Sequence, residues 1–289
     1  MPEPDPPFVT LRDGRRLAYA EHGDPAGSPA FYFHGTPGSR LEGRLLGDAA
    51  VRHGVRLIAV DRPGYGRSDY KRGRKLIDWP DDVADTADAL GIDRFAVIGL
   101  SGGGPHAQAL AARMPDRVTS ATIVSGAGSP EAALDGLTGV KRFFTRIALA
   151  WTPWLAFWAA LWAAFWAPRT QAWMMPRFVD RNVMRNKEAR EAFVVDVKEA
   201  LRQGAGAMRQ DLVMFARPWH VEPRDVGRVP VRLWHGEADR VVPVTIGRYY
   251  AREIPGCLAT FFPGEEHLMI IEHADDIMRA VSQMARAVH

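Results

Sequence analysis

The sequence has 289 residues, of which 47% are apolar and 25% are charged, and its formal net charge is +3 at pH 7. This composition is ordinary for a globular protein and excludes a long disordered chain. The 37 basic residues nearly balance the 34 acidic ones. Because no long basic run or arginine–aromatic interleave stands out, no nucleic-acid partner is predicted. The length suits one large domain, or a domain with a substantial insertion.

The cysteine count and the N-terminal residues indicate the cellular compartment. Cys257 is the single cysteine, so an intramolecular disulfide is excluded, and we interpret it as a buried structural thiol. Residues 1–7 are proline-rich and acidic, the opposite of a secretory signal, which predicts a cytoplasmic protein. Cysteine and histidine show no zinc-type spacing, and no metal or organic cofactor is predicted.

In chain order, short apolar runs first alternate with helical patterns, which predicts an α/β fold on a largely parallel sheet. Asp13 and Gly14 form a turn signal between two β-like runs and predict a hairpin. The expected strands are Phe8–Leu11, Arg16–Glu21, Ala30–Phe33, Arg56–Val60, Phe95–Ile98 and Val118–Val124, with helices near 40–53, 80–90 and 102–113.

A second α/β series ends the chain, after a stretch of different character. Residues 128–222 lack β alternation, have a mostly helical pattern and are rich in tryptophan and methionine. We therefore predict a first core part at 1–127, a helical cap or lid at 128–222 and a second core part at 223–289. The elements expected in the last part are the strands Val231–Trp234 and Ala259–Phe262 and the helices 244–253 and 268–287.

Residues 99–103 (sequence GLSGG) follow a predicted strand and precede a predicted helix. In that place, G-x-S-x-G is typical of a nucleophile elbow, a sharp turn that raises a serine oxygen above the sheet. Flanking glycines avoid Cβ clashes in the turn, and the helix directs its first amides at developing negative charge. We predict Ser101 as a nucleophile; the alternative is an ordinary glycine-rich turn.

An attacking serine needs a base, and the oxyanion that it forms needs hydrogen-bond donors. Residues 34–38 (HGTPG) follow a strand that we expect beside the nucleophile strand, and their small side chains let the backbone approach a substrate. The amides of Thr36 and Gly102 are the predicted donors, because Pro37 has no N–H. We expect His34 to hold this loop rather than to act as the base.

The predicted acid and base come late in the chain. Asp239 follows one expected strand, and His267 lies in a loop after the next. The order Ser101, Asp239, His267 is the serine–acid–histidine order known in one class of hydrolases. Carboxyl ends of parallel strands share one edge of a sheet, so the three side chains are expected there together. Asp239 alone would be interpreted as a helix N-cap, and Glu237 is the fallback acid.

On these motifs the chain resembles the cap-containing, esterase/lipase-like serine hydrolases of the α/β-hydrolase superfamily. Residues 61–69 (DRPGYGRSD) resemble its D-x-x-G-x-G-x-S loop, residues 236–243 its acid loop and residues 264–267 its histidine loop. The resemblance covers about 8–125 and 230–289. It implies a mostly parallel central sheet flanked by helices, with a helical cap inserted between core strands. Relatives with an aspartate nucleophile are disfavoured because this chain has Ser101 at that position. Proline iminopeptidases are less favoured, because Thr36 replaces the second glycine of their His-Gly-Gly-Pro-Gly motif.

The predicted cap contains an uncharged segment, residues 147–167. Helical spacing predicts that its tryptophans share one face; they are Trp151, Trp154, Trp158, Trp162 and Trp166. We interpret them as packing a cap helix on the core, which is compatible with their also lining an apolar pocket. Peripheral contact with a membrane surface is an alternative. A transmembrane span is disfavoured by Pro153 and because the triad motifs require the insertion to fold back over the core.

The predicted function is hydrolysis of carboxylic esters of hydrophobic acyl or aromatic type through an acyl-enzyme, with a small hydrophobic ester-like substrate as partner. The same triad serves other reactions, so thioesterase, acyltransferase, amidase or peptidase, C–C hydrolase and lyase activities stay open. A second alternative is a non-catalytic small-ligand-binding protein of this fold, against which the complete Ser/Asp/His set argues. The motifs do not predict the oligomeric state.

Overall fold

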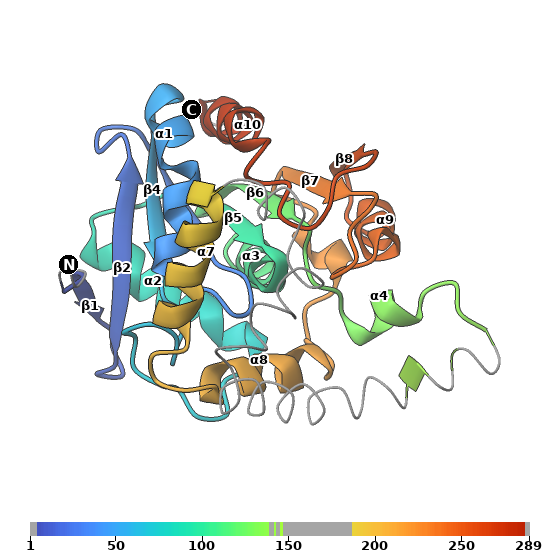
Figure 1. Cartoon of the computed structure of the whole chain (residues 1–289), viewed down its shortest axis with the longest axis horizontal. Coiled ribbons are helices and arrows are strands. Elements are labelled where there is room, and N and C mark those ends of the chain that lie inside the picture. The colour runs from blue at the N-terminus through green and yellow to red at the C-terminus, as the bar shows by residue number, and fades with distance from the viewer. Residues whose placement is uncertain (1–4, 139–141, 143–144, 147–186, 287–289) are drawn as a thin grey trace.

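A computed structural model of the chain describes residues 5–138, 142, 145, 146 and 187–286 (Figure 1). Its centre is an eight-stranded sheet of order β1-β2-β4-β3-β5-β6-β7-β8. The strands β1 and β2 are antiparallel to their neighbours, and from β4 onward all pairs are parallel. In chain order, the strands are β1 (Phe8–Thr10), β2 (Arg16–Gly23), β3 (Ser28–Phe33), β4 (Val55–Val60), β5 (Phe95–Leu100), β6 (Val118–Val124), β7 (Val231–Gly236) and β8 (Leu258–Phe262).

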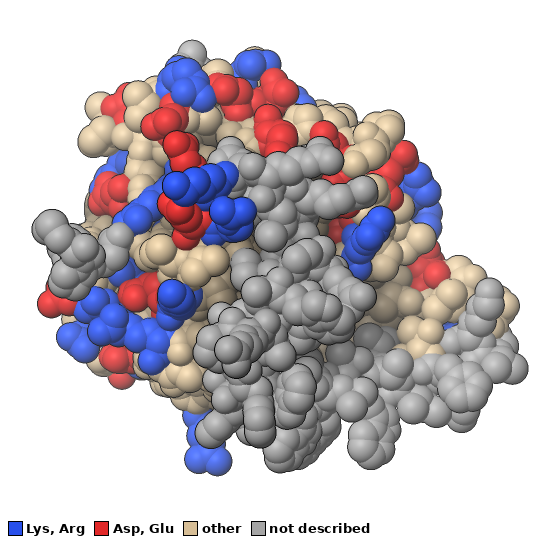
Figure 2. Space-filling view, viewed as in Figure 1, with Lys and Arg blue, Asp and Glu red and all other residues tan. Residues whose placement is uncertain are grey.

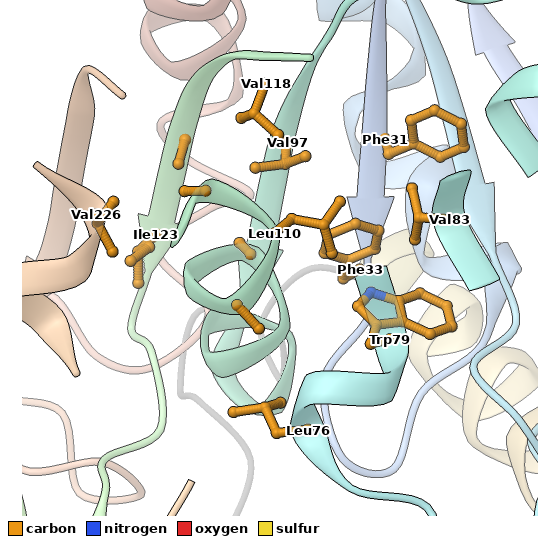
Figure 3. Packing of buried hydrophobic residues seen from close by; sticks show 14 of the residues in the cluster. Phe31, Phe33, Leu76, Trp79, Val83, Val97, Leu110, Val118, Ile123 and Val226 are labelled. Atoms are coloured by element: carbon orange, nitrogen blue, oxygen red, sulfur yellow. The ribbon is translucent and has the colours of Figure 1, made fainter. Parts of the chain in front are cut away.

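Helices cover both faces of the sheet because the central strands are buried on both sides. On one face lie α2 (Trp79–Ala89), α3 (Gly104–Arg113) and α9 (Val244–Glu253), and on the other lie α1 (Arg44–Arg52) and α10 (Ala274–Arg286). The alternation of side chains along β3 shows how this arises: Phe31 and Phe33 pack with the first group of helices, Tyr32 with the second. Figure 3 shows Phe33 beside Trp79 of α2 and near Leu110 of α3.

The remaining described helices lie in connections. The short 3-10 helices are η1 (Arg40–Gly43), η2 (Leu76–Asp78), η3 (Ser101–Gly103) and η4 (Pro223–Val226). Between β6 and β7 lie α4 (Pro130–Leu134), α7 (Lys187–Ala200) and α8 (Gly206–Phe215). The helix α7 packs against η1, and α8 lies below α3 in the view of Figure 1.

The predicted α/β-hydrolase fold and its parallel sheet are confirmed, as is the hairpin at Asp13, where β1 pairs with β2. The predicted closing helix at 268–287 is shorter, because α10 begins at Ala274. Residues 268–270 instead form turns and bury their apolar side chains against the core. The predicted helix near 40–53 is divided into η1 and α1.

The predicted cap lies only in part within the described residues. The tryptophan-rich segment 147–167 falls outside them, so its packing, pocket-lining and membrane interpretations stay predictions. Among the helices that the structure does describe, none combines the length and apolar character that crossing a membrane requires. On the face in Figure 2, described basic and acidic side chains lie interspersed, in keeping with the near-balance of charge in the sequence.

Candidate active site

Ser101 occupies the turn between β5 and α3. The strand ends at Leu100, and Ser101 opens η3, which runs directly into α3. The backbone φ of Ser101 is +51°. Such a conformation is uncommon for a residue with a side chain and occurs where surrounding structure enforces it, often at functional sites. The predicted strand–turn–helix context of this serine is therefore present.

Glycines let this turn lie directly against the neighbouring strand. A Cβ atom on Gly103 would overlap the carbonyl oxygen of Phe33 in β3, and one on Gly99 would overlap the carbonyl of Gly103. A side chain at Gly103 would push the turn away from β3, and one at Gly99 would push Gly103 away from the end of β5. The G-x-S-x-G spacing is thus the packing requirement of a tight turn whose two sides are in backbone contact.

Thr36 lies against the backbone of Gly102 next to this turn. An ideal Cβ on Gly102 would be 3.3 Å from the Thr36 nitrogen, and one on Gly35 would be 3.6 Å from the Cβ of Ser101. In the described part of the chain, the Thr36 N–H donates to no acceptor. Gly102 is near the start of a helix, where an N–H has no carbonyl one turn earlier to bond. The backbones of both predicted donors therefore lie close together next to the serine turn.

His267 and Asp239 meet at the same edge of the sheet, after β8 and β7. The His267 Nδ1 lies 2.8 Å from the Asp239 Oδ2, and both residues are buried. The other carboxylate oxygen, Oδ1, accepts the N–H groups of Val241 and Val242 at 2.8 and 2.9 Å. Burial raises the pKa of Asp239, but hydrogen bonds from His235 and His267 outweigh it and hold that pKa well below its ordinary value.

The structure brings together two of the three predicted triad residues. No hydrogen bond joins Ser101 to His267 among the described residues, although Ser101, like them, follows a parallel strand at its carboxyl end. Hydrogen bonds of this kind are often long before a substrate binds. Glu237, the fallback acid, points elsewhere and pairs with Arg248 at the surface, at 2.8 Å.

A model of the alpha/beta hydrolase fold family matches residues 31–274. The chain belongs to this family. Over 97% of its length, this hydrolase-family chain is 27% identical to a bifunctional esterase/perhydrolase from Acinetobacter calcoaceticus, of which 99% is covered. It is 26% identical to a 2-hydroxymuconate semialdehyde hydrolase from Pseudomonas putida, with 96% of this chain and 95% of the relative covered.

Solved structures support the same fold. An alpha/beta hydrolase fold protein from Nakamurella multipartita superimposes with a TM-score of 0.71 at 25% identity, covering 98% of this chain and 100% of the other. Membership of this family, together with the esterase-named relative, supports a hydrolase activity for this chain. In this hydrolase-family chain, the described residues contain no cluster of His, Cys, Asp and Glu suited to holding a metal ion.

His34 anchors the loop that carries Thr36. It is fully buried, its Nε2 accepts the N–H of Arg62 at 3.1 Å, and its Nδ1 lies 2.8 Å from the Gly35 carbonyl oxygen. Acceptance at Nε2 assigns the proton to Nδ1, which donates to Gly35. Burial and the nearby Arg62 lower the pKa of His34 well below its ordinary value, so the ring is neutral. With both nitrogens bonded inside the protein, this ring has no free atom to act as a base.

Sequence reasoning missed the buried side chains that support the site. The Arg62 Nη1 lies 2.6 Å from the Asp211 Oδ2, and neither side chain is accessible to solvent. His235 is also fully buried, and its Nε2 lies 2.9 Å from the Val242 carbonyl oxygen and 3.4 Å from the Asp239 Oδ2. Arg62 lies in the family-like loop 61–69, which was a usable signal, and His235 directly precedes the acid loop 236–243. Asp211 lies on α8 between β6 and β7, and no local pattern distinguished it.

A second buried carboxylate, Glu42, binds the backbone of the same loop. Its Oε2 accepts the Gly35 N–H at 2.8 Å and the Tyr32 hydroxyl at 3.1 Å. Burial raises the pKa of Glu42 from 4.5 to about 7. Nearby, Asp196 of α7 accepts hydrogen bonds from the backbone and the hydroxyl of Ser39. Glu42 therefore binds this loop directly, whereas Asp196 binds Ser39 just after it.

Proposed function

We propose that this protein hydrolyses carboxylic esters with hydrophobic acyl or aromatic groups, using Ser101 as nucleophile, His267 as base and Asp239 as acid. The observation that carries the proposal is the buried 2.8 Å contact between His267 and Asp239 at the sheet edge that also bears Ser101. The strained backbone of Ser101 adds to it, because a φ of +51° raises the serine at the start of a helix.

The reaction follows from this arrangement. The Asp239 carboxylate accepts the Nδ1 proton of His267, which leaves Nε2 as the basic nitrogen. When a substrate is bound, Nε2 takes the Ser101 proton as the oxygen attacks the ester carbonyl. The imidazolium gives that proton to the departing alcohol, and an acyl-serine forms. Water, deprotonated by the same nitrogen, then releases the acid.

The oxyanion of both tetrahedral intermediates would accept the N–H groups of Thr36 and Gly102. The Thr36 nitrogen lies 3.3 Å from where a Cβ on Gly102 would be, and the Thr36 amide has no other acceptor in the described residues. Removing one such donor in a hydrolase typically costs about 10²- to 10³-fold in kcat. The preference for hydrophobic substrates rests on the tryptophans of segment 147–167.

A second candidate is acyl transfer with the same residues. It is favoured by the similarity to a relative that is named both an esterase and a perhydrolase. An acyl-serine reacts with whichever nucleophile reaches it, so the two reactions differ only after the first step. Product analysis with water, an added alcohol and hydrogen peroxide in competition would identify the preferred acceptor.

The experiment is covalent labelling of the whole protein with a fluorophosphonate, followed by intact mass measurement and assay on a series of p-nitrophenyl esters. We expect one adduct on the wild type, none on Ser101→Ala, and much slower labelling of His267→Ala. Asp239→Asn should lower kcat by about 10⁴-fold, because the imidazole loses the partner that selects its tautomer.

A folded wild type that takes up no adduct, with circular dichroism unchanged, would refute the proposal and favour the non-catalytic ligand-binding alternative. A fall in kcat in Glu237→Gln equal to that in Asp239→Asn would instead mean that the acid is wrongly assigned. Glu237 is a suitable control because its carboxylate pairs with Arg248 at the surface.

A further inference from the structure

We infer that Asp211 of α8 is a positioning residue: through Arg62 and the Thr36 hydroxyl, it sets the direction of the Thr36 N–H. This inference rests on the proposed function, because it assigns a role to the oxyanion donor of that reaction. Its consequence is that part of the oxyanion site is organised by the segment between β6 and β7, which contains α8.

Asp211 is the centre of a buried hydrogen-bonded cluster. Its Oδ2 accepts the Thr36 hydroxyl at 2.9 Å, the Tyr65 hydroxyl at 2.8 Å and the Arg62 Nη1 at 2.6 Å. Its Oδ1 pairs with Arg74. Every partner comes from the first 74 residues of the chain, whereas Asp211 comes from α8. One carboxylate thus joins α8 to the loop that bears Thr36.

Arg62 determines which way the Gly35–Thr36 peptide faces. Its Nη2 donates to the Gly35 carbonyl oxygen at 2.9 Å and to the Thr36 hydroxyl oxygen at 2.9 Å. His34 Nδ1 binds the same carbonyl at 2.8 Å. In a planar trans peptide, the N–H points away from the preceding C=O. With the carbonyl of Gly35 held toward Arg62, the N–H of Thr36 must point to the opposite side.

The Thr36 side chain links this cluster to the second donor. A Cβ atom on Gly102 would overlap the Thr36 hydroxyl oxygen, so that hydroxyl lies directly against the Gly102 backbone. The hydroxyl donates its single proton to Asp211 and accepts a hydrogen bond from Arg62. It therefore has no proton left to donate to an oxyanion, and we assign it the role of holding the Thr36 and Gly102 backbones in place.

Burial explains why the arrangement is rigid. Arg62 and Asp211 have no solvent-accessible side-chain surface, and burial of an unpaired charge is costly. Arg62 can leave the Gly35 carbonyl only by giving up its ionic partner as well. The burial of Asp211 raises its pKa, but Arg62 and Arg74 outweigh this and keep that pKa well below its ordinary value, so it remains ionised.

The test compares Thr36→Val with Thr36→Ser in ester hydrolysis. Valine keeps the amide and the shape of threonine but loses the hydroxyl, whereas serine keeps the hydroxyl. We expect Thr36→Val to lower kcat by about 10- to 100-fold with KM nearly unchanged, because a displaced donor weakens transition-state binding alone. Thr36→Ser should retain activity within a few-fold. Affinity for a phenylboronic acid, which forms a tetrahedral serine adduct, should fall in parallel with kcat.

The chain offers a matched control in Ser39→Ala. The Ser39 hydroxyl lies three residues further along and also donates to an insertion carboxylate, Asp196 of α7, but it does not touch the Gly35–Thr36 peptide. Its loss should lower the melting temperature and leave kcat within about two-fold of wild type. Asp211→Asn, which removes the charge that holds Arg62, should lower kcat in the same sense as Thr36→Val.

The outcomes separate this inference from the proposed function. A wild type that is labelled at Ser101 and hydrolyses esters, with Thr36→Val as active as Ser39→Ala, would overturn the inference and leave the proposed function standing. Equal loss in Thr36→Ser and Thr36→Val would also overturn it, because the hydroxyl would then not be the cause. A wild type that forms no adduct at Ser101 would overturn both the proposed function and this inference. Should Thr36→Val not fold, the kcat and boronic acid affinity of Asp211→Asn decide the question.

Discussion

At the scale of single residues, the loop at 34–38 is held by groups of opposite charge. Arg62 binds its carbonyl oxygens and Glu42 binds the Gly35 N–H. The groups facing Glu42 are the Tyr32 hydroxyl, the carboxylate of Asp196 and, at longer range, Arg62. The burial of two neighbouring carboxylates, which raises the pKa of both Glu42 and Asp196, makes this part of the loop sensitive to pH.

This arrangement predicts a stability that falls as the pH rises from about 4.5 to about 7. Over that range the folded state holds a proton on Glu42 that the unfolded chain has released, because burial raises its pKa to about 7. Stability decreases with pH wherever the folded state binds more protons. Glu42→Gln cannot ionise, so its melting temperature should change less over the same range.

The measurement is thermal unfolding followed by circular dichroism at half-unit pH intervals. Glu253→Gln, at a partly exposed position on the last turn of α9, is the control and should keep the wild-type slope. A Glu42→Gln variant with the wild-type pH dependence would show that this carboxyl does not titrate in the range.

At the scale of elements, the candidate site depends on how closely η3 approaches the end of β3. Gly103 touches the Phe33 carbonyl, and Gly104 at the start of α3 lies against Gly126 after β6. These contacts set the distance between Ser101 and the loop at 34–38. Packing of backbone on backbone leaves no flexible side chain that can move aside, so this junction tolerates little added volume.

Gly103→Ala should therefore destabilise the protein by about 2 kcal/mol or more and lower ester hydrolysis, because the new methyl group overlaps Phe33. Gly47→Ala is the matched control: it lies within α1, where the added methyl would be 3.7 Å from the His22 Cβ. Alanine there should be neutral or stabilise by up to about 1 kcal/mol. Urea unfolding measures both effects, and equal stability of the two variants would contradict the account of the turn.

At the scale of the whole molecule, the segment between β6 and β7 is attached to the core by buried charges. Arg40 pairs with Glu199 of α7 at 2.8 Å, and Arg62 pairs with Asp211 of α8 at 2.6 Å. Both arginine side chains are almost entirely buried. Helices attached in this way share the stability of the core, so we expect α7 and α8 to unfold with it.

The prediction at this scale is a large cost for Asp211→Ala, of about 3 to 5 kcal/mol, because two buried guanidinium groups lose their counter-charge. Asp135→Ala, which breaks a partly exposed pair with Arg252, should cost less than about 1 kcal/mol. Urea titration followed by both fluorescence and circular dichroism gives the values. Similar midpoints for the two variants would mean that the buried cluster contributes little to stability.

Much of this protein was predictable from sequence because the signals are local. Apolar runs of strand length predicted the sheet, and the glycines around Ser101 predicted a tight strand-to-helix turn, since each reflects the conformation of a few adjacent residues. The prediction was less accurate at the end of the chain: residues 268–273 continue an apolar pattern, yet they form turns before α10. An apolar pattern indicates burial, and burial is compatible with either conformation.

The sequence by itself determined the family, the sheet and the order of the candidate residues Ser101, Asp239 and His267. Only the tertiary structure showed that His267 meets Asp239, that Glu42 binds Gly35 and that Arg62 pairs with Asp211, 149 residues further along. The physical reason is that a buried ion pair is selected by geometry and the exclusion of water. Neither leaves a periodic pattern along the chain, so an aspartate on a helix looks the same in sequence whether it faces solvent or neutralises a buried arginine.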